Sequence, residues 1–481
     1  MNNNQFFFDG ISGSNEHSAN CNVAKNYKVY ADLPHRYFSD IESMKNYVIQ
    51  LQKLGVNVLL LLPHFFPSFS EYVVKDYERP ANLFGNWEHF SDFMNFVREH
   101  GMDRMIDIPF NHADWMADNL KREWFINHWS NGTEAGADDM DADGNRVRIN
   151  WGAYILDNSN KDLIEYWLQK VIYPHVEKYC VNAIRIDAAW GLDRNGLSEI
   201  IGKTKSRFPK VWFLAENLGM DKLINLAESG IKAGAERFFN NYFWHSNGRG
   251  VPIDYYRFFK RSKGLPTCTI FSNHDVLMPA MRALSKIKKN EYAHLNDRAL
   301  YRQIIERDGI DSPQKLSENV TDRIQMLMKL DFCISAFLST DIMIGAGSER
   351  LLIEKTDVLL SNSDSFAKGI NTGFSDFMKM ILKLKASDEI FHSEGVVIPI
   401  GNWSRSKDGI KGYVKRFGKR HLMVAANTNL DNAAETFIPA TFRKSGKSAF
   451  STDSGIKSVT SDKIPEKILL KPGQALALFQ L

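Results

Sequence analysis

Residues 183–187 read Ala-Ile-Arg-Ile-Asp, and residues 211–216 read Val-Trp-Phe-Leu-Ala-Glu. Each segment is an apolar run of strand length that ends in a carboxylic acid. Short apolar runs of this kind are typical of strands that are buried on both faces of a parallel sheet. The residues between them, from about Gly196 to Phe208, are expected to form a helix, so the two strands are predicted to be neighbours in a β/α arrangement.

The same alternation of strand and helix extends along the chain. Residues 56–62, for example, form an apolar run that Pro63 closes. This many repeats favours a parallel sheet that closes into a (β/α)8 barrel of the TIM type, an α/β fold. Other expected strands are 27–32, 104–108, 269–271 and 341–344, and other expected helices are 41–54, 87–100 and 163–179.

Two segments interrupt this pattern. Residues 113–157 are polar and rich in turn-forming residues, which predicts a small domain inserted after the third strand. Residues 395–481 contain short runs of alternating polarity, which are typical of an antiparallel β domain and predict a C-terminal β-sandwich. The barrel is then formed by residues 1–112 and 158–394, with a charged excursion after the seventh strand.

Composition limits the classes of function. Of 481 residues, 44% are hydrophobic and 24% are charged, and the net charge is only +3, so we expect a globular protein with no nucleic-acid partner. The one basic run, Lys286-Ile287-Lys288-Lys289, is predicted to be a solvated surface. No apolar stretch is long enough to cross a bilayer, so no membrane association is expected.

Cysteine usage and the first residues bear on location. Cys21, Cys180, Cys268 and Cys333 are far apart and match no metal-ligand spacing, so we expect buried free thiols in a reducing compartment. Residues 1–9 contain no basic segment that leads into a long apolar run, and no secretory signal is expected. A cytoplasmic location follows, although export by a route without a signal would leave no mark.

Polar residues follow four of the expected strands. They occur at 107–112, 185–187, 215–217 and 271–275. In β/α barrels the active site lies at the C-terminal ends of the strands, so these residues are expected to meet there. The interval from Glu216 to Asp275 is about twice that from Asp187 to Glu216, as two strand–helix units would be to one. A single acid after a strand is commonly a helix cap, but the joint order and spacing favour catalysis.

Two of these acids differ in their surroundings. Arg185 precedes Asp187 by two residues, whereas Glu216 follows the apolar run 213–215. A neighbouring arginine keeps a carboxylate ionised, and a nearby negative charge raises the pKa of a second acid. Two carboxyl groups that differ in protonation state can divide the roles of nucleophile and acid between them.

The four segments resemble the four signature regions of the α-amylase family, glycoside hydrolase family 13. The likeness extends to 54–57, to Tyr72 with Asp76-Tyr77, and to 156–158, and it covers roughly residues 27–481. The resemblance implies a retaining α-glycosidase or transglycosidase with an oligo- or polysaccharide substrate.

The resemblance also implies roles for individual residues. Asp187 would be the nucleophile, Glu216 the general acid and then the base, and Asp275 the residue that stabilises the transition state. Arg185 would keep Asp187 ionised. The remaining substrate-binding residues would be Tyr72, which would stack beneath the sugar ring, and His112 and His274, which would donate to sugar hydroxyls; Asn111-His112 could instead cap the barrel rim.

Some positions depart from the family. Trp190 and Gly191 stand where many amylases have a Lys-His pair associated with calcium, so we expect neither a metal site nor a cofactor. Asp139, Asp141, Asp143 and Gly144 imitate the start of a calcium loop, but Asn150 stands at position twelve, and a polar hairpin turn is expected. Glu349, in the segment 345–349, is a candidate counterpart of the family's Gly-Glu pattern.

Three readings of the function remain. The first is hydrolysis of an α-glucan or of short α-glucosides. The second is glycosyl transfer. The segment of residues 238–244 resembles one in maltosyltransferases that use maltose 1-phosphate, but Ala188 and His274 differ from the residues that those enzymes carry at these positions. The third is a barrel that only binds glycan or protein. Linkage, chain length, endo or exo action and oligomeric state stay open. Of six tryptophans, one or two are expected to line a sugar site: Trp115, Trp124, Trp129, Trp151, Trp190 and Trp244.

Overall fold

The structure is a computed structural model that describes residues 27–480 with several gaps. The structure does not describe residues 1–26, 142, 144, 218–233, 241–263, 293, 356–357, 359–361, 401–408, 444–448, 453–454, 458–464 and 481. Cys21, Gly144, Trp244 and most of residues 238–244, for which the sequence made predictions, therefore lie outside the described residues.

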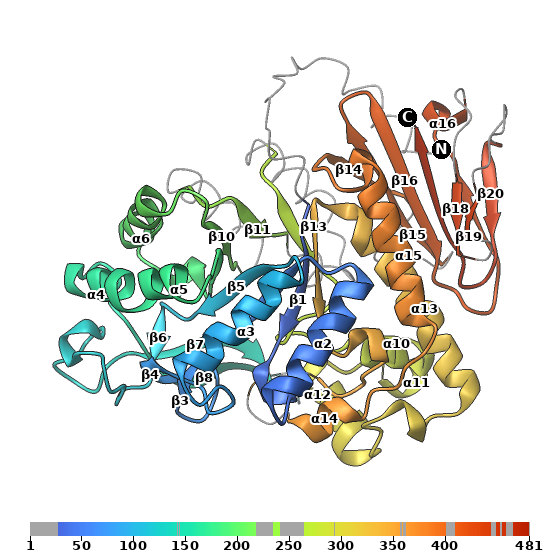
Figure 1. Ribbon diagram of the computed structural model, residues 1–481. Coiled ribbons are helices and arrows are strands. Elements are labelled where there is room, and N and C mark those ends of the chain that lie inside the picture. Colours follow the sequence, from blue (N-terminus) through green and yellow to red (C-terminus); the bar gives the residue numbers. More distant parts are fainter. Residues whose placement is uncertain are drawn as a thin grey trace.

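Eight parallel strands close into a barrel, in the order β1-β13-β12-β11-β10-β9-β5-β2 (Figure 1). This confirms the predicted fold class. Each apolar run pairs with the next in the register expected for a parallel sheet; Leu214, for example, lies opposite Arg185. The strands are β1 (Val29–Leu33), β2 (Val58–Leu61), β5 (Asp103–Ile108), β9 (Ala183–Ile186), β10 (Trp212–Ala215), β11 (Arg237–Phe239), β12 (Thr267–Ile270) and β13 (Asp341–Gly345).

Helices surround the barrel and are bounded by local signals. In α2 (Ile41–Leu54) the N-cap Asp40 accepts a hydrogen bond from the Ser43 amide, and Gly55 ends the helix with a φ of 109°. A glycine at this position adopts the left-handed conformation without the steric cost of a Cβ. The other long helices are α3 (Trp87–Glu99), α6 (Arg194–Arg207), α10 (Pro279–Ile287), α13 (Glu318–Leu338) and α15 (Phe374–Ser387).

The helix predicted at 163–179 is divided in the structure. It consists of α4 (Lys161–Tyr166), a π-helical segment (Trp167–Ile172) and α5 (Tyr173–Glu177). The excursion between β12 and β13 contains α11 (Lys289–Tyr292), α12 (Asp297–Tyr301) and a second π-helical segment (Arg302–Arg307), and α14 (Ser363–Ala367) follows β13. Lys286 and Lys289 are exposed, as predicted.

Two small sheets border the C-terminal ends of the barrel strands. After β2, the hairpin of β3 (Phe65–Pro67) and β4 (Val74–Pro80) forms one of them. After β5, the predicted insertion contains a sheet in the order β6-β8-β7, from His112–Ala113, Arg146–Ile155 and Glu134–Met140. Asp141 accepts hydrogen bonds from the amides of Asp143 and Asn145 in the β7–β8 turn, so this segment forms the predicted hairpin turn.

The hairpin and the insertion are interlocked. Val73 forms a small apolar cluster with Ala135 and Ala153. At Gly152, which has a φ of +71°, an added Cβ would lie 2.3 Å from Cζ of Phe69. The positive φ favours glycine at position 152, and a larger residue there would displace the Phe69 ring.

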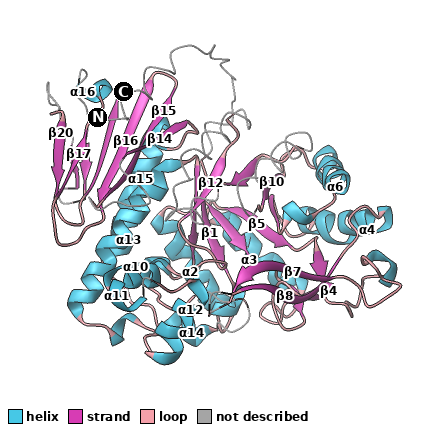
Figure 2. Cartoon of the chain, turned by 180° about the vertical axis from the view of Figure 1, so that it is seen from behind, coloured by secondary structure: helices cyan, strands magenta, loops and turns pink. Residues whose placement is uncertain are grey.

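The C-terminal segment folds into two antiparallel sheets. The larger has the order β14-β15-β16-β21-β18-β19 and the smaller pairs β17 with β20. Ile410, Met423 and Leu470 belong to the apolar cluster between them. In both views this domain and the insertion lie on opposite sides of the barrel (Figures 1 and 2). The strands are Val396–Ile400, Ile410–Phe417, Arg420–Asn427, Ala434–Phe437, Ala449–Ser451, Gly455–Lys457, Lys467–Leu470 and Ala475–Gln480, and a short helix α16 spans Ala440–Arg443.

Two buried lysines bond to the C-terminal end of α13, and one of them, Lys415, connects the C-terminal domain to the barrel. Lys415 of β15 donates from Nζ to the carbonyl oxygens of Phe337, at 2.7 Å, and Ser393, at 3.0 Å. Lys385 of α15 donates to those of Ala336, at 2.7 Å, and Ser339, at 2.8 Å. The carbonyls at the C-terminal end of a helix lack intrahelical partners, and cations satisfy them.

The cysteines agree only partly with the sequence prediction. Cys268 and Cys333 are buried free thiols, whereas Cys180 is a free thiol that is only half-buried. Among the described residues, no helix combines the length and the apolarity needed to span a membrane.

Candidate active site

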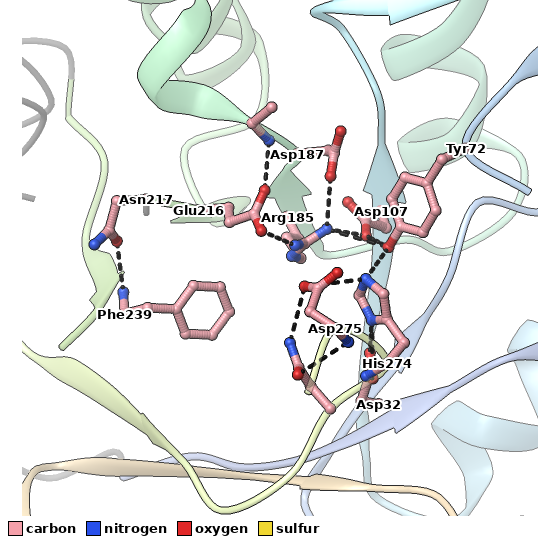
Figure 3. A network of polar contacts seen from close by, with 12 residues as sticks. Asp32, Tyr72, Asp107, Arg185, Asp187, Glu216, Asn217, Phe239, His274 and Asp275 are labelled. Atoms are coloured by element: carbon pink, nitrogen blue, oxygen red, sulfur yellow. Dashed lines mark hydrogen bonds and ion pairs between the residues drawn. The ribbon is translucent and has the colours of Figure 1, made fainter. Parts of the chain in front are cut away.

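Alternation along the strands places the candidate residues in the mouth of the barrel. Ala183 and Leu214 belong to the apolar cluster inside the barrel. Because every second residue of a strand points to the same face, Arg185 and Asp187 continue the inward face of β9, and Glu216 continues that of β10. Figure 3 shows these side chains converging with Asp275, which follows β12.

Arg185 lies at the centre of the site. Its Nη1 is 3.2 Å from Oδ1 of Asp187 and its Nη2 is 2.9 Å from Oε1 of Glu216. Nη1 also contacts Oδ2 of Asp107. The sequence predicted pairing with Asp187, which is present, but one guanidinium serves three carboxyl groups. Residue spacing could not predict this sharing, because Asp107 and Glu216 come from strands on either side of β9.

The turn after β9 supports Glu216. Ala188 has a φ of 43°, a left-handed conformation that a residue with a Cβ adopts rarely. In this conformation its amide donates to Oε2 of Glu216 at 2.6 Å. Glu216 thus accepts a backbone hydrogen bond at one oxygen and forms an ion pair with Arg185 at the other. The strained turn fixes the orientation of this carboxyl group.

Two of the three carboxyl groups around Arg185, those of Asp187 and Asp107, have raised pKa values. Burial, followed by the charge of Glu216, raises the pKa of Asp187 well above its ordinary value, and Arg185 opposes the shift. The expectation that Arg185 keeps Asp187 ionised is therefore wrong for this arrangement, because burial and Glu216 outweigh the arginine. Burial also raises the pKa of Asp107 to about 6, again against Arg185. A single buried cation does not neutralise three carboxylates, so the cluster retains a proton at neutral pH.

Asp275 is the most accessible of the candidate carboxylates, with 37% of its side chain exposed. Asn273 holds it through two hydrogen bonds of 3.1 Å, one from the Asn273 amide group and one from the Asp275 backbone. Although burial acts to raise it, the pKa of Asp275 is lowered by His274, Arg185 and Lys355. Asp275 is therefore an ionised carboxylate at the open side of the site.

Tyr72 and His274 connect Asp275 to the cluster around Arg185. The Tyr72 hydroxyl donates to Oδ2 of Asp107 at 2.6 Å and lies 2.9 Å from Nε2 of His274. The two rings stack, with centroids 5.1 Å apart. The turn of the β3–β4 hairpin brings Tyr72 to this position, beside the strand ends.

His112 lies at the base of the insertion, where β6 leaves the barrel. It is buried, and its ring centroid is 5.2 Å from that of Trp151. Burial lowers the pKa of His112 to about 4, so the imidazole is neutral near pH 7. The structure thus gathers all seven residues named from the sequence around one mouth of the barrel, with His112 toward the insertion.

The sequence reasoning assigned no role to Asp32. Its carboxylate is fully buried and accepts hydrogen bonds from the backbone and from Nδ1 of His274. The alternation of side chains along β1 could have indicated Asp32, because Asp32 lies two residues after Tyr30 and so on the same inward face of the strand. A second buried carboxyl, Glu71, lies 3.3 Å from Nε2 of His35, and burial raises its pKa to about 8.

Comparisons with known proteins address the fold. No model of a known protein family matches the sequence. One curated relative, a glucan 1,6-alpha-glucosidase from Streptococcus dysgalactiae subsp. equisimilis, is 26% identical over 106 residues. The match covers 21% of this chain and only 19% of the relative, so it spans about a fifth of that protein.

Solved structures match over nearly the whole chain. A noncanonic maltogenic α-amylase from Thermotoga neapolitana has a TM-score of 0.66 at 16% identity, covering 95% of this chain and 99% of its own. A trehalose-6-phosphate hydrolase from Bacillus licheniformis has a TM-score of 0.64 at 12% identity, with coverages of 95% and 99%. The chain has the fold of the α-amylase family.

The calcium site of many α-amylases can be tested against the residues present. Oδ1 of Asn111 lies 3.0 Å from the position that a Cβ on Gly191 would occupy, so its side chain fills the space beside this glycine. Calcium takes six to eight oxygen ligands, several of them from carboxylates. Within the described part of the chain, no group of three or more His, Cys, Asp or Glu residues is arranged so that it could hold a metal ion. The residues around Asn111 do not fit this amylase site.

Other positions singled out by the α-amylase resemblance lie farther from the centre. Glu349 is buried and accepts a hydrogen bond of 2.9 Å from the Tyr47 hydroxyl, so it supports the barrel wall. Among the described tryptophans, Trp124 is buried, whereas Trp129 is 77% exposed. The Trp151 ring contacts that of His112, a candidate site residue.

Proposed function

We propose that the protein is an α-retaining glycoside hydrolase that acts on an α-glucan or on short α-glucosides through a covalent glycosyl enzyme. The observation that carries the proposal is the sharing of Arg185. Neighbouring nitrogens of one guanidinium hold Asp187 and Glu216 side by side, and Asp275 lies across from them (Figure 3). Two adjacent carboxyl groups are what retaining cleavage requires.

In the first step, Asp187 attacks the anomeric carbon and forms a carbon–oxygen bond with it. The glycosidic bond breaks at the same carbon, and Glu216 gives its proton to the leaving oxygen. In the second step a water molecule gives a proton to Glu216 and attacks the same carbon, which releases Asp187. The two inversions return the α configuration, and the ionised Asp275 stabilises the positive charge of each transition state.

This sequence of steps requires one proton on the pair formed by Asp187 and Glu216. Burial and the neighbouring Glu216 raise the pKa of Asp187, which supports retention of one proton by the pair at neutral pH. The mechanism needs that proton to lie on Glu216 when substrate is bound. Arg185 contacts both carboxyl groups and so stabilises the remaining negative charge in either arrangement.

The similar proteins guide the choice of substrates. They include a maltogenic α-amylase, a glucan 1,6-alpha-glucosidase and a trehalose-6-phosphate hydrolase. Their identities to this chain are too low to select among these substrates. A test panel should therefore contain α-1,4- and α-1,6-linked glucans, the matching disaccharides, trehalose 6-phosphate and sugar 1-phosphates.

The test is a product analysis over this panel, with the anomeric configuration of the first product read by proton NMR. We expect free sugar in the α configuration. A β product would contradict retention. Glycosyl transfer to a sugar or to phosphate would instead support the transferase alternative, which uses the same carboxylates. Absence of turnover on the whole panel, with glycan binding intact, would support a barrel that only binds.

A further inference from the structure

A buried carboxylate stands behind the candidate site, outside the roles assigned so far. Asp32, at the end of β1, has no exposed surface. Its Oδ2 accepts a hydrogen bond from the His274 backbone amide, at 2.7 Å, and lies 3.0 Å from Nδ1 of the same residue. One carboxylate thus holds both the backbone and the ring of His274 (Figure 3).

This contact spans a strand. The strand β13 lies between β1 and β12, so the loop after β12 must cross the end of β13 to reach Asp32. Gly345 ends β13 opposite Asp32, and a Cβ there would lie 3.2 Å from Cα and N of Asn273. Such a contact is tight enough to displace the loop. The Gly345 amide also donates to Oγ of Ser272 at 2.8 Å.

The hydrogen bonds define which ring nitrogens of His274 carry protons. Nδ1 faces the acceptor Asp32 and therefore donates. The Tyr72 hydroxyl gives its own proton to Asp107, so towards Nε2 of His274 its oxygen is an acceptor. Both nitrogens then donate, which makes the ring a cation.

The charged groups around this cation come from several elements. Asp32 on β1 and Asp275 on its own loop favour the cation, whereas Arg185 on β9 opposes it. Although burial acts to lower it, Asp275 and Asp32 together raise the pKa of His274 to about 9. Two further acids lie close to His274, Glu71 before Tyr72 and Asp107 on β5. Burial raises the pKa of each acid, and the charge of His274 opposes that rise.

We propose that Asp32 is a positioning residue of the site, which anchors the loop after β12 and keeps His274 a cationic donor aimed at the substrate. It is the outer end of a chain of hydrogen bonds and ion pairs that runs from Asp32 through His274 and the neutral Tyr72 to Asp107 and Arg185. The role of His274 toward a sugar rests on the proposed function; the anchoring itself does not.

The test uses the full chain with Asp32→Asn, which keeps the shape of the side chain but removes its charge. The His274 ring is followed by NMR in protein labelled at histidine, and its signal is identified by its absence in His274→Gln. We expect the wild-type ring to titrate at about pH 9, and the midpoint in Asp32→Asn to be lower. With a substrate found in the panel, KM should rise more at pH 8 than at pH 6, while kcat at pH 6 stays within a few-fold of wild type.

Two variants are the controls. Ser272→Ala removes the contacts of Ser272 with the Gly345 amide and with Oγ of Ser348, and it perturbs the same loop without changing charge. It should leave the His274 midpoint unchanged. Asp32→Glu keeps the charge and should retain a midpoint above that of Asp32→Asn. A wild-type midpoint in Asp32→Asn, or an equal shift in Ser272→Ala, would overturn the proposal.

A remaining measurement covers the case in which Asp32→Asn does not fold. In Asp275→Asn the anchor is intact, so His274 should still titrate well above the ordinary histidine value of about 6.5. A midpoint at that ordinary value would mean that Asp32 does not hold the cation. Because these titrations need no substrate, they separate failure of the anchoring role from failure of the proposed glycosidase activity.

Discussion

The two ends of the barrel both enclose charged side chains, and they satisfy them differently. At the N-terminal ends of the strands, Lys385 and Lys415 donate to backbone carbonyls, and Glu394 accepts from the amides of Thr267 and Thr340. At the C-terminal ends, Arg185 faces three carboxyl groups at once. At the first end the two lysines and Glu394 bond to the main chain, beside one buried ion pair between Arg237 and Asp341, whereas the charged groups around Arg185 at the second end bond mainly to one another.

The difference separates a structural role from a chemical one. Buried charges that are fully hydrogen-bonded to the backbone fix the local structure, and removing one leaves polar groups without partners. Carboxylates crowded around one cation raise one another's pKa values and store unfavourable energy that a reaction can use. Changes at the C-terminal ends should therefore affect activity, and changes at the N-terminal ends should affect stability.

The largest expected effect is that of Asp187→Ala. Loss of the nucleophile should lower kcat by several orders of magnitude. Since burial and Glu216 disfavour the ionised form of Asp187, its removal should leave the melting temperature unchanged or raise it. Steady-state kinetics and calorimetry measure the two effects. Wild-type turnover in this variant would contradict the assignment.

Glu216→Gln should impair both steps, because one residue acts first as acid and then as base. A substrate with a very good leaving group needs little protonation, so formation of the glycosyl enzyme should be partly spared. Azide needs no base and should then accelerate turnover. Attack on a β-linked intermediate inverts the centre, so the product should be the α-glycosyl azide. Isolation of the β azide would exclude Asp187 as the nucleophile.

Truncation at Gly395 tests the opposite end of the barrel. Removal of the C-terminal sheets uncovers one side of α13 and takes away the Lys415 donor, so the product should be insoluble or much less stable. Expression yield and thermal unfolding measure this. As a milder form, Lys415→Met should cost roughly 1–3 kcal/mol and leave kcat unchanged. A soluble, fully active truncation would show that the domain is dispensable.

The free energy of unfolding should depend on pH because the pKa of Lys385 differs between the folded and the unfolded chain. Burial lowers its pKa from 10.5 to about 8, so between these values the unfolded chain binds more protons than the folded one. Stability from this group is therefore lost as pH falls through about 8 and recovered as pH rises toward 10.5. Relative to Lys385→Met, the wild type should gain up to about 3 kcal/mol over this window. Urea unfolding at pH 7 and pH 9.5 measures it, and a constant difference between the two proteins would contradict it.

The smallest expected effect is that of a chelator. Because the residues around Asn111 and Gly191 do not fit the calcium site of many amylases, treatment with EDTA should leave activity and melting temperature nearly unchanged. A large loss restored by calcium would contradict this, and the β7–β8 turn with Asp141 would then be the first segment to examine.

Much of the fold was predictable because buried parallel strands are marked locally. The runs ending at Asp187 and Glu216 needed no tertiary information, and the doubled interval to Asp275 left room for one more strand. That strand, β11, is only Arg237–Phe239, too short for its composition to identify it. The π-helical segment at Trp167–Ile172 was also beyond periodicity, since one extra residue in a helix leaves its apolar spacing nearly intact.

The candidate residues were predictable one by one, but their connections were not. Sequence placed Arg185 beside Asp187 and implied an isolated pair. In the folded chain the guanidinium also meets Asp107 and Glu216, because strands distant in sequence are adjacent in the barrel. Asp32 was missed for the same reason, since its partner His274 follows it by more than half the described chain.

The contact between Phe69 and Gly152 has a consequence for how this architecture can be recombined. The hairpin that presents Tyr72 and the insertion that begins at His112 are complementary in shape where Phe69 meets Gly152, because an added Cβ at position 152 would overlap the Phe69 ring. Grafting either loop alone onto another barrel would separate complementary halves. The hairpin and the insertion should therefore be exchanged together, and a chimera that receives both should keep the geometry of the barrel mouth.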